Sequence, residues 1–139
     1  MENMSLTQIS VEIVDIVSEA DIIRARLKAK VIAESIGFNY MDQARIATAV
    51  SELARNAFQY AGRGKIIIKS TTNQARKGIE IVAEDHGPGI ENLELALKGG
   101  HSTSTGLGMG LSGSKRLMDE FEIQTNIGKG TVITIRKWL

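Results

Sequence analysis

The sequence predicts an α+β two-layer sandwich, with helices packed on one face of a mixed, mostly antiparallel sheet. Three segments carry apolar residues at helical spacing, and four or five shorter segments have the alternation of strands. Several of these segments are joined by short turns, as in two-layer α+β folds. We expect residues 1–139 to form a single domain, because this length suits one hydrophobic core.

The first predicted strand covers residues 8–14, where apolar and polar residues alternate. This alternation places Ile9, Val11 and Ile13 on one face of the strand.

The first predicted helix begins after Ser18, which resembles an N-cap because an acid, Asp21, follows three residues later. It ends at Ile36, since Gly37 is a typical helix stop. Four cations lie two residues apart within it: Arg24, Arg26, Lys28 and Lys30. This spacing spreads them around the helix, which favours solvated charges over a dedicated docking surface.

The second predicted helix runs from about Met41 to Ala61 and is rich in alanine. Its residues at core spacing are Ala47, Val50, Ala54, Ala57 and Phe58.

The rest of the chain alternates strands with turns. The expected strands are 64–71, 78–84, 121–126 and 131–137, with a sharp break at 87–89 and a turn at 128–130. A short helix is expected at about 91–97, a Gly/Ser/Thr segment at 99–106, and a further helix at about 107–120.

Composition excludes several functional classes. A formal net charge of +1 gives no electrostatic case for binding nucleic acid. The chain has no cysteine and only two histidines, His86 and His101, which argues against a thiolate or histidine metal site. With no apolar run long enough to span a bilayer and no signal-peptide pattern, we expect a cytoplasmic protein without a membrane partner.

The sequence partly matches two glycine-rich nucleotide-binding motifs, but it lacks a required feature of each. Residues 108–113 (GMGLSG) satisfy G-x-G-x-x-G, but loop residues precede them, whereas a dinucleotide site needs a strand there. The Walker A pattern fails because Ser114 comes before Lys115. A glycine loop that enters a helix N-terminus still suits phosphate, although a surface loop without a ligand has the same appearance.

Two polar constellations accompany this loop. Glu52 and Asn56 are four residues apart and share one helical face, where their oxygens could ligate Mg²⁺ or position water. Asp85 ends an apolar strand and could accept a hydrogen bond from a planar amino group, while Gly87 and Gly89 leave room for a flat base. Taken separately, an exposed polar pair and a plain β-turn are also consistent with these residues.

The order of the three motifs resembles the N, G1 and G2 boxes of the GHKL (Bergerat-fold) ATPase superfamily, and residues 128–131 resemble its last box. Within it, residues 51–56 (SELARN), 84–90 (EDHGPGI), 106–111 (GLGMGL), 116–121 (RLMDEF) and 137–139 (KWL) are similar to the RsbT family of stressosome switch kinases. The resemblance extends over almost the whole chain.

The resemblance implies a role for each motif residue. Asp85 would bind the adenine amino group, supported by Thr131 through water, and Asn56 would coordinate Mg²⁺. Gly106, Gly108 and Gly110 would form the ATP lid, and Glu52 would be the catalytic base. Neither histidine matches a catalytic residue. Related anti-sigma factor kinases place a lid arginine near the γ-phosphate, but residues 101–105 hold no cation, which leaves Arg55 and Lys115 as weak candidates.

The function implied is a serine/threonine protein kinase that uses Mg-ATP to phosphorylate a STAS-domain partner of the RsbS or RsbR kind. When released, such a kinase binds and activates a PP2C-type phosphatase in a stress and sigma-factor partner-switching pathway. Three alternatives stay open: an anti-sigma factor kinase of the RsbW or SpoIIAB kind, a histidine kinase catalytic domain, and a non-catalytic ATP-binding module. The histidine kinase is disfavoured by the absence of a dimerisation helix, a phosphoacceptor segment and a long lid.

Overall fold

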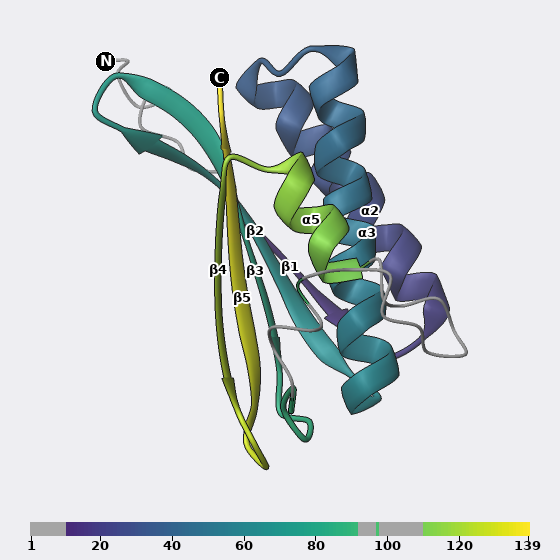
Figure 1. Ribbon diagram of the computed structural model, residues 1–139. Coiled ribbons are helices and arrows are strands. Elements are labelled where there is room, and N and C mark those ends of the chain that lie inside the picture. The colour runs from purple at the N-terminus through teal and green to yellow at the C-terminus, as the bar shows by residue number, and fades with distance from the viewer. Residues whose placement is uncertain (1–10, 92–96, 98–109) are drawn as a thin grey trace.

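The computed structural model describes residues 11–91, 97 and 110–139, which form two layers (Figure 1). One layer is a sheet of five strands, and the other holds three helices that lie on the same face of that sheet. The elements in chain order are β1 (Val11–Ile16), α2 (Glu19–Ile36), α3 (Tyr40–Ala61), β2 (Gly64–Asn73), β3 (Arg76–Asp85), α5 (Gly110–Leu117), β4 (Glu120–Asn126) and β5 (Gly130–Trp138).

The strand order in the sheet is β1-β2-β3-β5-β4, and every pairing among the described strands is antiparallel. The predicted α+β sandwich with helices on one face is therefore confirmed. The parallel component that a mixed sheet allows does not occur among these strands. The short helix expected at 91–97 falls largely outside the described residues.

The core fills the space between the two layers. Alternate residues of each strand point toward the helices, as Ile66 of β2, Ile81 of β3 and Ile133 of β5 illustrate, and all three are buried. Helix α3 crosses the middle of the sheet and buries the residues predicted for it, with Phe58 partly buried at the edge. Within the described residues, none of the helices combines the length and apolar character needed to cross a lipid bilayer.

The face of β1 that Val11 and Ile13 share, as the alternation predicts, is turned away from the core. Val11 and Ile13 are exposed, whereas Val14 and Ile16 are buried under α2 and α3. Both faces of this short strand carry aliphatic residues, so alternation alone could not decide which one meets the helices. Pairing with β2 decides it, because Val14 lies opposite the buried Ile66. Ile9 lies outside the described residues.

Helix α2 has the predicted ends, but its first turn is held by a different group. The Ser18 side chain accepts no hydrogen bond from the helix backbone. Instead, the Asp21 carboxylate accepts hydrogen bonds from the Val17 N–H (3.0 Å) and the Ser18 hydroxyl (3.1 Å). At the other end, Gly37 adopts the left-handed conformation (φ 118°), and its N–H binds the carbonyls of Ala33 and Glu34.

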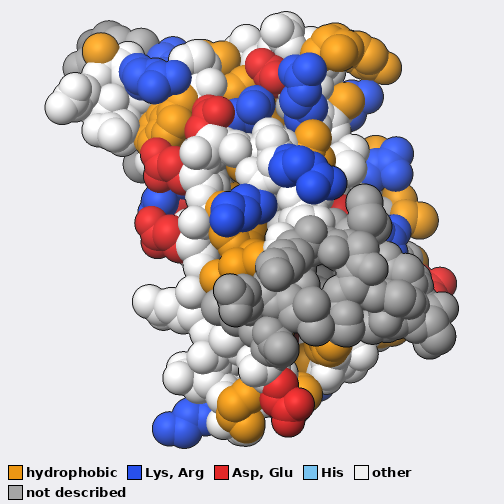
Figure 2. Space-filling view, viewed as in Figure 1, with side chains coloured by type: hydrophobic (Ala, Val, Ile, Leu, Met, Phe, Trp, Pro, Cys, Tyr) orange, Lys and Arg blue, Asp and Glu red, His pale blue; other side chains and the backbone are white. Residues whose placement is uncertain are grey.

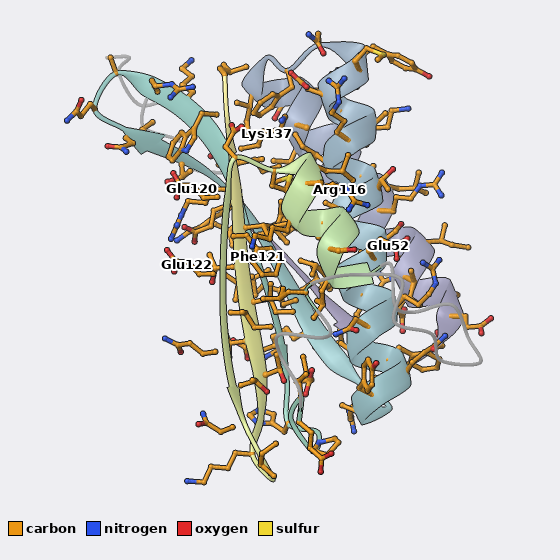
Figure 3. The ribbon with its side chains drawn as sticks, in the orientation of Figure 1. Glu52, Arg116, Glu120, Phe121, Glu122 and Lys137 are labelled. Carbon is orange, nitrogen blue, oxygen red and sulfur yellow. The ribbon has the colours of Figure 1, made fainter. Side chains whose placement is uncertain are left out.

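Helix α5 is shorter than predicted. It ends at Leu117, and Glu120, expected in its last turn, already pairs with Arg136 in the sheet. The Glu120 carboxylate accepts hydrogen bonds from Arg136 (2.9 Å) and from the Trp138 indole N–H (2.7 Å). Figure 3 shows Glu120 on the side of the sheet that faces away from the helices. These cross-strand hydrogen bonds explain why β4 begins at Glu120. Helix propensity, which considers each residue alone, contains no information about such contacts.

A charged ladder extends this contact across the open face of the sheet. Lys69 contacts Glu80 (3.4 Å), and Glu80 accepts a hydrogen bond from Arg136 (2.9 Å), which also binds Glu120. One residue from each of β2, β3, β5 and β4 thus forms a row of alternating sign.

Lys137 holds the end of α5 to the sheet from the opposite face. Its ammonium group donates a hydrogen bond to the carbonyl of Leu117 (3.2 Å) and lies 4.0 Å from carboxylate oxygens of Asp42 and Asp119. A cation is favourable here because the last carbonyls of a helix carry partial negative charge. Figure 3 shows the residue beside the end of α5.

We predict that Lys137→Ala lowers the free energy of unfolding by about 1–2 kcal/mol, because the Leu117 carbonyl loses its donor and a cation is removed from beside Asp119 and the end of α5. The matched control is Lys77→Ala at an exposed position of the β2–β3 hairpin, which should change it by less than about 0.5 kcal/mol. Urea denaturation followed by circular dichroism measures both. Equal values for the two variants would contradict the role of Lys137.

Candidate functional site

The candidate site lies at the end of the sheet where β3 stops and β5 starts. Asp85, the last residue of β3, points toward the helices and is only 8% exposed. It lies opposite Thr131 of β5, which is also buried. Both predicted base-binding residues therefore come together on the inner face of one sheet end.

The Asp85 carboxylate occupies a poorly hydrated position, and this burial raises its pKa above the ordinary value. Three weaker influences lower the pKa: a hydrogen bond from the Gly87 N–H, the charge of His86, and a hydrogen bond from the Thr131 N–H. The Gly87 bond measures 2.9 Å to one carboxylate oxygen. The group is thus a hydrogen-bond acceptor that gains from any further donor, since water reaches it poorly.

Thr125 of β4 belongs to this site, although the sequence analysis did not single it out. Its hydroxyl oxygen accepts a hydrogen bond from the Ile90 N–H (2.8 Å) and lies 2.9 Å from the hydroxyl of Thr131. It therefore ties the loop after β3 to the hydroxyl beside Asp85. The signal was present in the sequence, because Thr125 and Thr131 lie at equal distances from Gly128 in the hairpin turn and must pair across it.

The two glycines after β3 have packing reasons of their own. A Cβ on Gly87 would lie 2.6 Å from the Cβ of Ala61, the last residue of α3. Gly89 has a positive φ of 82°, and a Cβ there would lie 2.6 Å from the carbonyl oxygen of Asn126. These contacts hold the loop against both α3 and the β4–β5 turn, so its backbone passes close to Asp85.

Helix α3 supplies the amide and carboxylate expected from the sequence. Asn56 is 4% exposed, and among the described residues nothing forms a hydrogen bond with its side-chain amide. Its amide offers both an acceptor oxygen and donor N–H groups, which suit a polar ligand. Glu52 lies one turn earlier, is 27% exposed, and forms an ion pair with Arg55 (3.2 Å). Figure 3 marks Glu52 about halfway along α3.

The start of α5 is directed at the same part of α3. Ser114, fully buried, donates a hydrogen bond to the carbonyl of Ala49 (3.2 Å), and the two helices run antiparallel (Figure 1). One turn back along α5 is Gly110, one turn forward along α3 is Leu53, and Asn56 lies three residues beyond Leu53. The N-terminus of α5 therefore approaches Asn56, and its free N–H groups suit an anion. Gly106 and Gly108 lie outside the described residues.

Neither candidate for a phosphate-binding cation is shown to serve the site. Arg55 is engaged by Glu52, and Lys115 is exposed on α5. A hollow of about 400 Å³ also opens beside Asp85 at this end of the sheet. Its lining residues are Asp15, Ala61, Arg63, Gly64, Lys65, Glu84, Asp85 and His86. Three carboxylates outnumber the two Lys and Arg side chains there, so the hollow does not favour an anion.

Comparison with known proteins places this geometry in context. Residues 17–137 match the model of the histidine kinase-like ATPase domain. Serine/threonine-protein kinase RsbT of Bacillus subtilis (strain 168) is 50% identical over 126 residues, which cover 91% of this chain and 95% of that protein. An anti-sigma F factor of Thermoanaerobacter sp. (strain X514) is 33% identical over 102 residues, covering 69% of this chain and 70% of that one.

The solved structures agree on the fold. The mycobacterial sensor histidine kinase MprB superposes with a TM-score of 0.55 at 18% identity, covering 93% of this chain and 97% of that one. At this identity the likeness concerns the arrangement of helices and strands alone.

We predict that Asp85→Asn stabilises the ligand-free protein. Because burial raises the pKa of Asp85, the folded state holds its proton more tightly than the unfolded state, so the contribution of Asp85 to stability falls as pH rises through this range. At neutral pH the variant should melt at a higher temperature than the parent. Near pH 4, close to the ordinary carboxyl pKa, the gap should shrink.

Thermal unfolding of both proteins across this pH range gives the measurement. Asp15→Asn is the matched control, because it removes the same charge at an exposed position. A gap that favours the parent, or one that does not change with pH, would contradict the stated effect of burial on Asp85.

Proposed function

The chain belongs to the family of histidine kinase-like ATPase domains, and from this premise we propose that it binds Mg-ATP between α3, α5 and the end of the sheet and phosphorylates a serine or threonine of a partner protein. The observation that carries the proposal is the convergence of a buried carboxylate, Asp85, and a buried amide, Asn56, at this end of the fold. Asp85 comes from the sheet and Asn56 from α3, so the two groups can bind different ends of one ligand, the base and the phosphates.

At the base end, Asp85 accepts a hydrogen bond from the exocyclic amino group of adenine. Its carboxylate is held by the Gly87 N–H, so it is oriented before the nucleotide arrives. The Thr131 hydroxyl, which Thr125 contacts, supports the same base through water. Gly87 and Gly89 keep the neighbouring backbone close enough for a flat ring to lie against it.

At the phosphate end, the amide oxygen of Asn56 is a hard ligand of the kind Mg²⁺ prefers. Bound Mg²⁺ supplies neutralisation of the charge on the phosphates. The N-terminus of α5 adds backbone donors from Gly110 onward, and Gly106 and Gly108 complete the glycine segment. Because phosphoryl transfer has a loose transition state, holding the groups in line and neutralising their charge provides most of the catalysis.

Glu52 is the catalytic base in this proposal. It lies one helical turn from Asn56 on the same side of α3, so it is placed beside the phosphate end and not beside the base. The ion pair with Arg55 orients the carboxylate along this side of the helix. Its task is to accept the proton of the attacking hydroxyl while the phosphoryl group leaves ATP.

The partners we propose are a STAS-domain protein as substrate and scaffold, and a PP2C-type phosphatase that the released kinase activates, both in the cytoplasm. Support comes from 50% identity to a serine/threonine kinase over nearly the full length of both chains. The second candidate is an anti-sigma factor kinase, which the 33% identity to anti-sigma F factors favours. Titration with a purified STAS protein and a purified sigma factor separates them, because tight ATP-dependent binding of the sigma factor alone would select the second.

We predict that Asp85→Asn and Asn56→Ala each weaken Mg-ATP binding at least about 10-fold, since each leaves a buried ligand group unpaired at a cost of about 1–3 kcal/mol. Thr125→Val should have a smaller effect in the same direction, because it only frees the Thr131 hydroxyl and the Ile90 N–H. Isothermal titration calorimetry measures all three, with Asp15→Asn as the control. Parent-like binding by both Asp85→Asn and Asn56→Ala would show that the pocket is elsewhere.

We predict that Glu52→Ala separates chemistry from binding. The variant should bind Mg-ATP within a few-fold of the parent but transfer phosphate about 10²–10⁴ times more slowly, because the proton is taken only in the transition state. Glu52→Gln should behave in the same way. The measurement pairs a labelled-ATP transfer assay with a nucleotide titration.

The control for the lost ion pair is Arg55→Ala, which frees the Glu52 carboxylate without removing it. If slow transfer arose from the broken ion pair alone, Arg55→Ala would be equally slow. Unchanged transfer by Glu52→Ala would remove this residue from the catalytic role, and lost ATP binding would make it a residue of the metal site.

A further inference from the structure

Helix α2 exposes an apolar stripe on the side that faces away from the core. Ile23, Leu27 and Val31 are four residues apart, so they lie in line along the helix, and they are 57%, 52% and 64% exposed. The opposite side of the same helix is buried through Ile22 and Ala29, among others. The stripe is therefore a second apolar face, and it stays exposed beside the described residues.

The exposed apolar surface continues where α2 meets α3. Tyr40 and Met41 open α3 and are both exposed. The ammonium group of Lys30 lies 5.1 Å from the centre of the Tyr40 ring, which links this end to the stripe. Figure 2 shows hydrophobic side chains gathered at this top corner of the molecule, with Lys and Arg side chains nearby.

Cations flank the stripe on both sides. From their positions in the helical repeat, Arg24 and Lys28 lie along one side, and Arg26 and Lys30 along the other. Arg24 contacts Asp21 (3.3 Å) and Lys28 contacts Glu12 (3.3 Å). In the described part of the chain, neither Arg26 nor Lys30 has a carboxylate partner. The four cations are spread over both sides of the helix, as their spacing predicts, and each side borders the exposed stripe.

We propose that α2 is a docking surface for an amphipathic helix of a partner protein, one with an apolar seam flanked by acidic residues. A helix presents apolar residues at the same spacing as the stripe, so the two can pack along their length. Carboxylates beside the seam would complement Arg26 and Lys30, since Arg24 and Lys28 on the other side already contact carboxylates of this chain. This favours an acidic partner over an uncharged or basic helix.

A second copy of this chain does not fit the surface. If two α2 helices packed antiparallel about Leu27, Ile23 of one would meet Val31 of the other, but Arg24 would face Lys28 and Arg26 would face Lys30. All four flanking positions would then oppose like charges, which costs free energy. A membrane fits less well than a helix, since the stripe is narrow and Ile23, Leu27 and Val31 include no Trp or Phe.

The surface is separate from the candidate ATP site. Helix α3 lies between α2 and α5 (Figure 1), so a helix docked on α2 leaves Asp85 and the start of α5 uncovered. The inference does not depend on the proposed kinase activity. Peptide docking and ATP binding are measured independently, and either can fail without the other.

The test uses a fluorescein-labelled synthetic peptide of about 18 residues, with leucine at every third or fourth position and glutamate beside this seam. Fluorescence anisotropy measures its binding to the full chain. Leu27→Glu should weaken binding at least about 10-fold, because it places a carboxylate within the apolar contact. Arg26→Glu should weaken it about 3- to 10-fold and reduce the dependence on salt.

Two matched variants control for the added charge: Ile127→Glu at an exposed apolar position of the β4–β5 turn and Lys77→Glu at an exposed cation. Both should bind the peptide like the parent. A peptide with lysine in place of glutamate should bind at least about 10-fold more weakly than the acidic one. Shifts of backbone amide resonances on adding the acidic peptide should be confined to α2 and the start of α3.

Four results would overturn the proposal. The first is no binding of the acidic peptide, and the second is equal loss of binding in the control variants. The third is preferential binding of the parent to phosphatidylserine–phosphatidylcholine vesicles that Leu27→Glu abolishes, which would make the stripe a membrane-surface element. The fourth is a parent dimer that Leu27→Glu converts to a monomer, measured by light scattering. Unchanged circular dichroism and ATP binding of Leu27→Glu show that the variant is folded.

Discussion

The close contact between α3 and the end of the sheet is the constraint on which the candidate site depends. Ala57 and Ala61 of α3 lie against Gly64 and Gly87, where an added Cβ would come within 2.7 and 2.6 Å of the alanine methyl groups. Larger residues at these contacts would separate the two layers. Because no side chain stands between them, the amide of Asn56 and the carboxylate of Asp85 lie at the same end of the core, although they belong to different layers.

This constraint also explains the electrostatic state of Asp85. A helix packed so closely on the sheet excludes water from the carboxylate, which raises its pKa and makes its ionised form unfavourable without a ligand. The two N–H donors from Gly87 and Thr131 compensate only in part. A buried carboxylate at this position lowers the stability of the ligand-free protein but provides a strong hydrogen-bond acceptor for a ligand. Such a trade-off between stability and function is common at binding sites.

The fold class and most element boundaries could be predicted from the sequence because they follow from periodicity and from glycine positions. The buried face of β1 could not, since both of its faces carry aliphatic residues and only pairing with β2 distinguishes them. The predicted end of α5 lies three residues beyond the observed one for a similar reason. Glu120 forms hydrogen bonds with Arg136 and Trp138 of another strand, which places it in the sheet. In both places, contacts between residues distant in sequence decide the outcome.

The candidate site likewise contains residues that the sequence analysis identified and one that it missed. Asp85 and Asn56 stood out as polar residues in unusual positions, and Thr131 followed from the resemblance to the GHKL superfamily. The structure places all three in buried positions around one end of the sheet. Thr125 was missed because a threonine in a strand has nothing unusual about it until its partner across the hairpin is known. The apolar stripe on α2 was also hidden, since Ile23, Leu27 and Val31 look like core residues in a sequence.

The charged ladder on the open face of the sheet has a consequence for how this protein behaves at high concentration. Exposed aliphatic residues such as Ile13 lie on that face, and two such sheets could stack face to face at about 10 Å. Stacking would also bury the row formed by Lys69, Glu80, Arg136 and Glu120, and removing ions from water costs several kcal/mol for each. The same bonds that start β4 therefore keep the bare side of the sheet from aggregating.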